Sequence, residues 1–165
     1  MKKILLPTDF SKASDQVIAF ALEAFNDEPC VFYFMHAYPY EVYGLDALCL
    51  LQQGEEIFKE ADMKVFVKMV DQVSHFAKQE KYSKHFLKLI CKDVELIKGI
   101  REVIKEFDID ILLIGTEGEN PKTHQYKEKT VNKIVEEIKS CPVMTIPLSG
   151  EAWASMGLED IKLAC

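Results

Sequence analysis

A pair of glycines, Gly115 and Gly118, directly follows the apolar run 110–114. Glycines let an anion approach backbone N–H groups closely, and a helix N-terminus directed at the same point adds a partial positive charge. The next helical pattern begins with Thr130 and Val131. This loop-then-helix arrangement suits the binding of a phosphate or a similar anion.

A second polar turn, Thr8 to Ser11, follows the apolar run 3–6 and Pro7. Asp9 in this turn has two interpretations: its carboxylate accepts hydrogen bonds from a ligand, or it orders the turn ahead of Ser11. Ser11 is a good N-cap for the helical pattern that follows. The sequence leaves both interpretations of Asp9 open.

The remaining chemistry-bearing residues indicate neither a catalytic site nor a metal site. No metal-like spacing relates the histidines, which are His36, His75, His85 and His124. No serine-hydrolase elbow or zinc-protease motif is present. No C-x-x-C spacing relates the cysteines, which are Cys30, Cys49, Cys91, Cys141 and Cys165. Reduced thiols of this kind are typical of a cytoplasmic protein.

Composition indicates one soluble globular domain, because 48% of the 165 residues are hydrophobic and 28% are charged. A formal net charge of -7 argues against a nucleic acid partner, which needs clustered Lys and Arg. The apolar stretch before Pro7 is too short for a signal peptide, and no run approaches a membrane span. We therefore expect a cytoplasmic protein with no nucleic acid or membrane partner.

Short apolar runs alternate with helical patterns along the chain. The predicted strands are 3–6, 30–35, 85–90, 110–115 and 142–147, and the predicted helices are 11–25, 55–80, one that Asp93 caps, and 130–140. Crossover helices between strands predict an α/β fold with three layers, in which helices cover both faces of a five-stranded, mostly parallel sheet. Ligands of such sheets bind at the carboxyl ends of the strands, where both polar segments fall.

Three pieces of the sequence resemble the universal stress protein family, in the right order over residues 1–147. They are Lys3–Ser11 together with His36, Asp110–Gly118, and Ser140–Pro147. The resemblance implies a Rossmann-like five-stranded parallel sheet, dimerisation and, in one branch, ATP binding with Mg²⁺. Within that branch the matching pocket positions are Thr8, Asp9, Ala37, Gly115, Gly118, Thr130 and Val131.

The second half of the ATP-binding pattern is altered in this chain. ATP-binding members have a glycine followed by Ser or Thr at the start of the helix, whereas here Lys129 precedes Thr130. A Cβ at that position can block close approach of phosphate to the backbone. Glu117, Glu119 and Glu128 add negative charge, which Lys122, Lys127 and Lys129 partly offset.

Two segments stand outside this pattern. Residues 148–165 form a tail. One interpretation is that the tail is a linker followed by the first strand of a second, truncated repeat, because Glu159–Ala164 resembles Lys2–Pro7. The alternative is a C-terminal strand of no repeat origin. Residues 38–53 form a tyrosine-containing loop, and such long loops are usually functional or mobile.

The leading functional hypothesis is a non-enzymatic, dimeric stress-response or signalling module with a degraded nucleotide pocket and no cofactor. Dimerisation would use the fifth strand, an edge strand whose unpaired backbone groups invite a second copy, and the tail as a further contact. The alternatives are an ATP-binding switch with slow hydrolysis and a protein that binds another small ligand beside the loop at 38–53.

Overall fold

The computed structural model describes residues 1–38, 55–116 and 128–147; for 55–62 and 128 it describes the backbone alone. The tail at 148–165, most of the loop at 38–53 and Gly118 therefore lie outside the described residues, and the hypotheses about them stay predictions. Within the described part of the chain, no helix combines the length and the apolar character needed to cross a bilayer.

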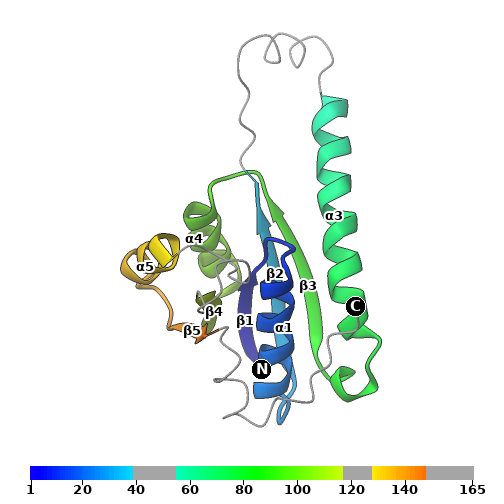
Figure 1. Cartoon of the computed structure of the whole chain (residues 1–165), viewed down its shortest axis with the longest axis vertical. Coiled ribbons are helices and arrows are strands. Elements are labelled where there is room, and N and C mark those ends of the chain that lie inside the picture. Colours follow the sequence, from blue (N-terminus) through cyan, green and yellow to red (C-terminus); the bar gives the residue numbers. More distant parts are fainter. Residues whose placement is uncertain (39–54, 117–127, 148–165) are drawn as a thin grey trace.

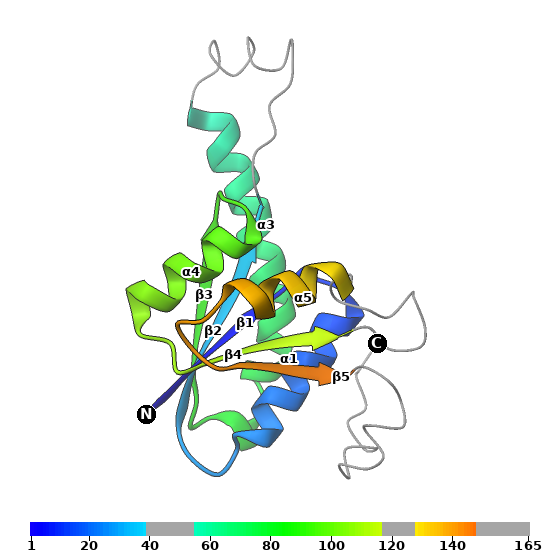
Figure 2. The same ribbon diagram turned by 90° about the vertical axis from the view of Figure 1, so that its left-hand side faces the viewer.

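The predicted five-stranded sheet is confirmed and is fully parallel, and the structure gives its strand order as β3-β2-β1-β4-β5. The strands are β1 (Lys2–Pro7), β2 (Cys30–Ala37), β3 (Phe86–Lys92), β4 (Ile111–Thr116) and β5 (Val143–Pro147). The helices are α1 (Lys12–Ala24), α3 (Glu55–Ala77), α4 (Leu96–Phe107) and α5 (Glu128–Glu137), with a short 3-10 helix, η1 (Glu80–Tyr82). Figures 1 and 2 show α1 and α3 on one face of the sheet and α4 and α5 on the other.

The central strands are apolar on both faces because helices cover both. Ile4, Leu5 and Leu6 of β1 have no exposed surface. Alternate residues point to opposite faces, so Ile4 and Leu6 pack in the cluster beneath α1 and α3, whereas Leu5 packs in the cluster beneath α4 and α5. The apolar run read from the sequence thus corresponds to a strand buried on both sides.

Three predicted helices have boundaries that differ from the structure. The third predicted helix is expected to have Asp93 as its cap, but α4 begins at Leu96, its N-cap residue is Glu95, and no side chain caps it. The helix predicted over 55–80 ends at Ala77, and the chain then forms η1; the helix predicted over 130–140 is α5, Glu128–Glu137. Helix ends depend on tertiary packing as well as on local capping preference, so the sequence pattern locates them less well than it locates the helices themselves.

The winding of the chain reverses between β1 and β4. From β1 the chain adds β2 and then β3 on one side, and afterwards it adds β4 and β5 on the other. β1 pairs with β2 over six register positions, but with β4 only at Ile4–Ile111 and Leu5–Leu112. Beyond these two positions, the carboxyl ends of β1 and β4 are not paired with each other. Parallel α/β sheets open a ligand-binding crevice at such a point.

Candidate functional site

The turn after β1 is held by its own side chains. The Asp9 carboxylate accepts hydrogen bonds from the Ser11 backbone N–H (3.0 Å) and the Ser11 hydroxyl (2.6 Å). Ser11 in turn caps α1, because its side-chain oxygen accepts from the Ser14 N–H at 3.1 Å. The structure thus shows the bonds expected for a turn-ordering role of Asp9, and its role toward a ligand stays a prediction.

Thr8 points away from solvent, into the face covered by α1 and α3. Its side chain is 2% exposed, and its hydroxyl lies 2.7 Å from Gln72 Oε1 and 3.0 Å from Ser14 Oγ. The hydroxyl also accepts from the Phe10 N–H at 3.2 Å. A side chain with these partners is part of the scaffold, and the Thr8 backbone N–H is also engaged, because it donates to the Met35 carbonyl oxygen at 2.8 Å.

Gln72 of α3 is the centre of this part-buried polar network. Its amide nitrogen donates to Ser14 Oγ (2.9 Å) and to the Asp15 carboxylate (2.6 Å), while its oxygen faces Thr8. Burial raises the pKa of Asp15, and the hydrogen bond from Gln72 opposes that shift. One side chain of α3 thus ties β1 and the first turn of α1 together.

Three aromatic rings gather at the carboxyl ends of β1 and β2. The His36 ring lies 4.3 Å from Phe10 and 5.8 Å from Tyr38, and its Nδ1 lies 2.7 Å from the Thr8 carbonyl oxygen. Phe10 adopts φ 62°, a left-handed conformation that costs an aromatic residue about 1–2 kcal/mol. The ring contact with His36 offsets that cost. Ala37, the last residue of β2, is half-buried and packs against the cluster beneath α4 and α5.

The β4 side of the crevice is built from backbone and from the first turn of α5. Gly115 is buried beside Ile146 of β5, and the Thr116 hydroxyl donates to the Ile146 carbonyl oxygen at 3.3 Å. Val131, in the first turn of α5, is 4% exposed and packs in the cluster beneath α4 and α5, so its side chain belongs to the core. Thr130 is half-buried and Lys129 is exposed.

The fold thus brings part of the predicted pocket to one edge of the sheet. Asp9 follows β1, Ala37 ends β2, and Gly115 lies on the carboxyl-terminal half of β4. Val131 and the Thr8 side chain instead lie in the core. Gln72 was not predicted as a candidate, although a polar residue beside the inward positions Met69, Val73 and Phe76 was a signal available in the sequence.

Two cysteines in the described part of the chain, Cys30 and Cys141, are structural thiols. Cys30 is 1% and Cys141 is 9% exposed, and burial raises the pKa of both thiols. A raised pKa keeps a thiol protonated and weakly nucleophilic near neutral pH. Neither residue therefore has the properties of a catalytic nucleophile.

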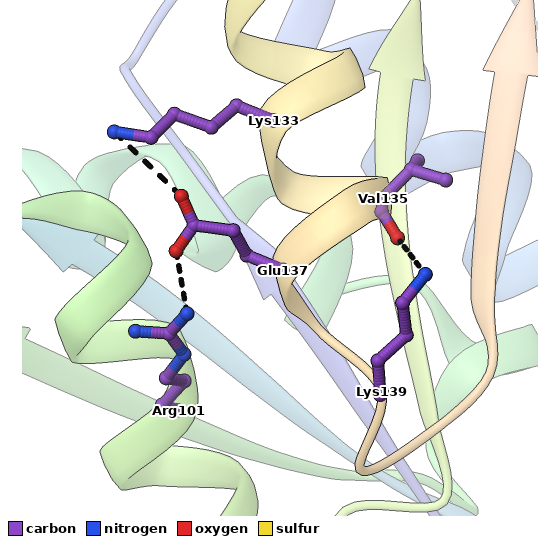
Figure 3. Close-up of polar contacts among 5 residues, drawn as sticks. All are labelled: Arg101, Lys133, Val135, Glu137 and Lys139. Carbon is purple, nitrogen blue, oxygen red and sulfur yellow. Dashed lines mark hydrogen bonds and ion pairs between the residues drawn. The ribbon is translucent and has the colours of Figure 1, made fainter.

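A separate groove of about 690 Å³ lies at the amino-terminal ends of β4 and β5, between α4 and α5. Its rim carries an ion-pair chain in which Glu137 accepts from Arg101 and lies 3.8 Å from Lys133 (Figure 3). Lys139 donates to the Val135 carbonyl oxygen at 3.1 Å. Arg101, Lys133 and Glu137 at this rim are engaged with one another, and the groove lies away from the crevice between β1 and β4.

The chain matches the model of the universal stress protein family over residues 1–147 and belongs to that family. The fold and the position of the crevice agree with this assignment. No curated protein sequence compared with this chain matches it significantly.

Solved structures with the same fold are also universal stress proteins. UspA from Lactobacillus plantarum is 18% identical, with a TM-score of 0.66, over 88% of this chain and 97% of that one. A family protein from Arabidopsis thaliana with AMP bound is 14% identical, with a TM-score of 0.57, over 92% and 94%. A universal stress protein in complex with cAMP is 11% identical, with a TM-score of 0.55, over 88% and 96%.

Proposed function

We propose that this chain is a non-enzymatic signalling module of the universal stress protein family, dimeric and with an altered nucleotide pocket. The observation that carries the proposal is the closed state of the turn after β1. Asp9 is bonded to Ser11, and the Thr8 hydroxyl is buried with Gln72. A ligand would have to replace these bonds or use the remaining acceptor capacity of Asp9.

The start of α5 supports the same proposal. Lys129 is exposed in the first turn of this helix, at the position where ATP-binding members have glycine. Phosphates approach backbone N–H groups most closely where no Cβ intervenes. The lysine charge attracts an anion, but the Cβ and the long side chain oppose contact with the backbone.

A thermal-shift titration with ATP and Mg²⁺ tests the altered pocket. Ligand that binds the native state stabilises it by about 2.7 kcal/mol at about a hundredfold excess over Kd. We expect no change in Tm for the natural chain and a rise for Lys129→Gly, which removes the Cβ. Lys129→Ala, which removes the amine but retains the Cβ, is the matched control. A clear rise in Tm for the natural chain with ATP contradicts the proposal.

Dimerisation through β5 is part of the proposal. β5 is an edge strand that pairs only with β4 within the sheet, and Met144 on it is 42% exposed. The Leu112 N–H donates to the Pro142 carbonyl oxygen, so the backbone groups of Val143 and Thr145 face away from β4. No strand in the described part of the chain pairs with these outward groups, which suit pairing with a second copy of β5.

Thr145→Pro tests this interface, because proline removes one outward N–H and leaves the bonds to β4 intact. We expect sedimentation velocity to show a dimer for the natural chain and for the control Thr145→Val, and a smaller species for Thr145→Pro. Equal masses for all three chains would exclude β5 as the interface.

A second candidate function is an adenine-nucleotide switch, favoured by the retained Gly115 at the crevice. Two of the similar structures hold AMP and cAMP, which carry a single phosphate and demand less of the loop before α5 than ATP does. The same titration with AMP and cAMP distinguishes the candidates. A rise in Tm with the monophosphates but not with ATP would favour a sensor of mononucleotides.

A further inference from the structure

His85 is a buried histidine at the amino-terminal edge of the sheet, between η1 and β3. Its residue is 8% exposed, and its ring centroid lies 5.1 Å from that of Phe32 and 6.3 Å from that of Tyr82. The crevice between β1 and β4 lies at the opposite, carboxyl-terminal edge. Histidine ordinarily changes its charge between pH 5 and 8, so a buried histidine can couple local structure to pH.

The imidazole of His85 extends the pairing of β2 with β3 by one position. The register of these two strands begins at Val31 and Phe86. The Cys30 N–H, one residue earlier, donates instead to His85 Nδ1 at 3.2 Å. The His85 backbone N–H donates to the Tyr82 carbonyl oxygen at 3.0 Å. The His85 side chain thus joins the start of the edge strand β3 to the start of β2.

The bond between Cys30 and His85 requires a neutral ring. A backbone N–H can only donate, so Nδ1 is the acceptor and the proton of the neutral imidazole lies on Nε2. Nε2 is buried and has no partner in the described part of the chain. In the imidazolium both nitrogens carry protons, so Nδ1–H would meet the Cys30 N–H, donor against donor. Protonation therefore removes the bond and leaves a buried charge whose donors lack acceptors.

The groups around His85 do not compensate a positive charge on its ring. The titratable groups that meet at this corner are Lys2 of β1, Glu23 of α1, Glu28, Cys30 of β2, Tyr82 of η1 and Lys84. The charge that acts on His85 is that of Lys84, a cation, and burial together with this charge lowers the pKa of His85. Glu23 instead accepts from the Tyr82 hydroxyl at 3.0 Å, and Glu28 acts on the neighbouring thiol.

We propose that His85 is a pH-dependent latch, whose protonation releases residues 83–86 from the start of β2 while the rest of the sheet stays folded. β3 pairs with β2 alone, so its first residue can separate without disturbing another strand. Phe86 is 57% exposed and therefore opposes this separation little. Tyr82 is buried and bonded to Glu23, so the opening ends there. Local openings of this kind cost less free energy than global unfolding.

Amide hydrogen exchange of the full natural chain, followed by NMR at the Cys30 N–H, tests the latch. The open state takes up the proton more readily, so the Cys30 protection factor should fall about tenfold per pH unit below pH 6.5 and level off below the lower folded-state pKa of His85. Leu5, at the centre of the sheet, reports global unfolding. Urea should accelerate exchange at Leu5 and hardly at Cys30, because a local opening exposes little surface.

Two results for the natural chain overturn the proposal. The first is a Cys30 protection factor that does not change with pH over this range. The second is a protection factor that depends on urea as strongly at Cys30 as at Leu5, since the opening would then be global.

His85→Asn separates titration from the loss of the acceptor. The Asn amide oxygen can accept from the Cys30 N–H but does not titrate, so we expect Cys30 protection that is independent of pH over the same range. His75→Asn, at an exposed position on α3, is the matched control and should keep the natural pH dependence. His85→Phe removes the acceptor and should lower Cys30 protection at neutral pH. A pH-dependent fall that persists in His85→Asn, or natural Cys30 protection in His85→Phe, overturns the proposal.

Discussion

Polar side chains are buried on one face of the sheet and exposed on the other. Beneath α1 and α3 lie the buried polar residues of the described chain, Thr8, Ser14 and His85, with exposures of 2%, 1% and 8%. Beneath α4 and α5 the core is apolar, and the polar contacts, such as Arg101 with Glu137, lie at the exposed rim. Loss of a buried hydrogen bond is costly, so such bonds fix the positions of the residues they join, whereas loss of an exposed ion pair costs little. The turn after β1, next to the crevice, lies on the face with the buried hydrogen bonds.

Gln72→Leu is expected to have the largest effect. The substitution leaves Thr8 and Asp15 without the partner that joins them, and buried groups that lose a hydrogen bond destabilise the fold by about 2–3 kcal/mol. Urea denaturation measures the free energy of unfolding. Gln79→Leu, at a position whose side chain makes no cap hydrogen bond, is the control and should change little. Equal effects of the two variants would show that the network is not critical.

His85 should give a smaller effect that depends on pH. Its Nδ1 accepts from the buried Cys30 N–H at 3.2 Å, and its Nε2 is buried without a partner. Loss of the acceptor in His85→Phe should cost about 1–2 kcal/mol near neutral pH. Exposed His75, changed to Phe, is the control.

Burial lowers the pKa of His85 below its ordinary value of 6.5, and the charge of Lys84 adds to this shift. The folded chain thus prefers neutral His85, and the unfolded chain binds the proton more readily. The stabilising contribution of His85 is full above pH 6.5 and is lost as the pH falls through the lower folded-state pKa. The cost of His85→Phe should therefore shrink in acid. A cost that grows as the pH falls would contradict this assignment.

Ser11→Ala should cost about 1 kcal/mol, the usual value for the loss of an N-cap. The variant also removes the hydroxyl that donates to Asp9 at 2.6 Å. If that bond keeps Asp9 from a ligand, Ser11→Ala should raise the Tm response to AMP relative to the natural chain. Ser74→Ala, whose hydroxyl donates only to the Asp71 carbonyl oxygen at an exposed site, is the control. Identical nucleotide responses would show that the Ser11 hydroxyl does not shield Asp9.

Arg101→Ala on the other face should have the smallest effect. Arg101 and Glu137 are 51% and 33% exposed, and surface ion pairs of this kind contribute about 0.5 kcal/mol or less. Denaturation in low and high salt measures the contribution, which screening should reduce further. If Arg101→Ala lowers the free energy of unfolding as much as Gln72→Leu does, the polar contacts on the two faces do not differ in their contribution to stability.

Much of the fold was predictable because the signals are local. The five strands of the sheet are short apolar runs, and the α/β alternation restricts the connections to parallel crossovers. The helix ends were less predictable, as α4 shows, because Asp93 has the properties of a cap that packing overrides. The candidate site was predictable only in part, since the Thr8 side chain points into the core and Gln72 reaches it from a helix 64 residues later.

The sequence by itself determined the strands, the helices that cover them and the edge at which polar residues gather, because strand and helix periodicity follow from the local apolar pattern. Only the tertiary structure decided the strand order, the bond of Asp9 to Ser11, and the link that Gln72 makes between β1 and α1. These features depend on side-chain contacts and strand pairing between elements distant in the chain, which the local sequence pattern does not specify.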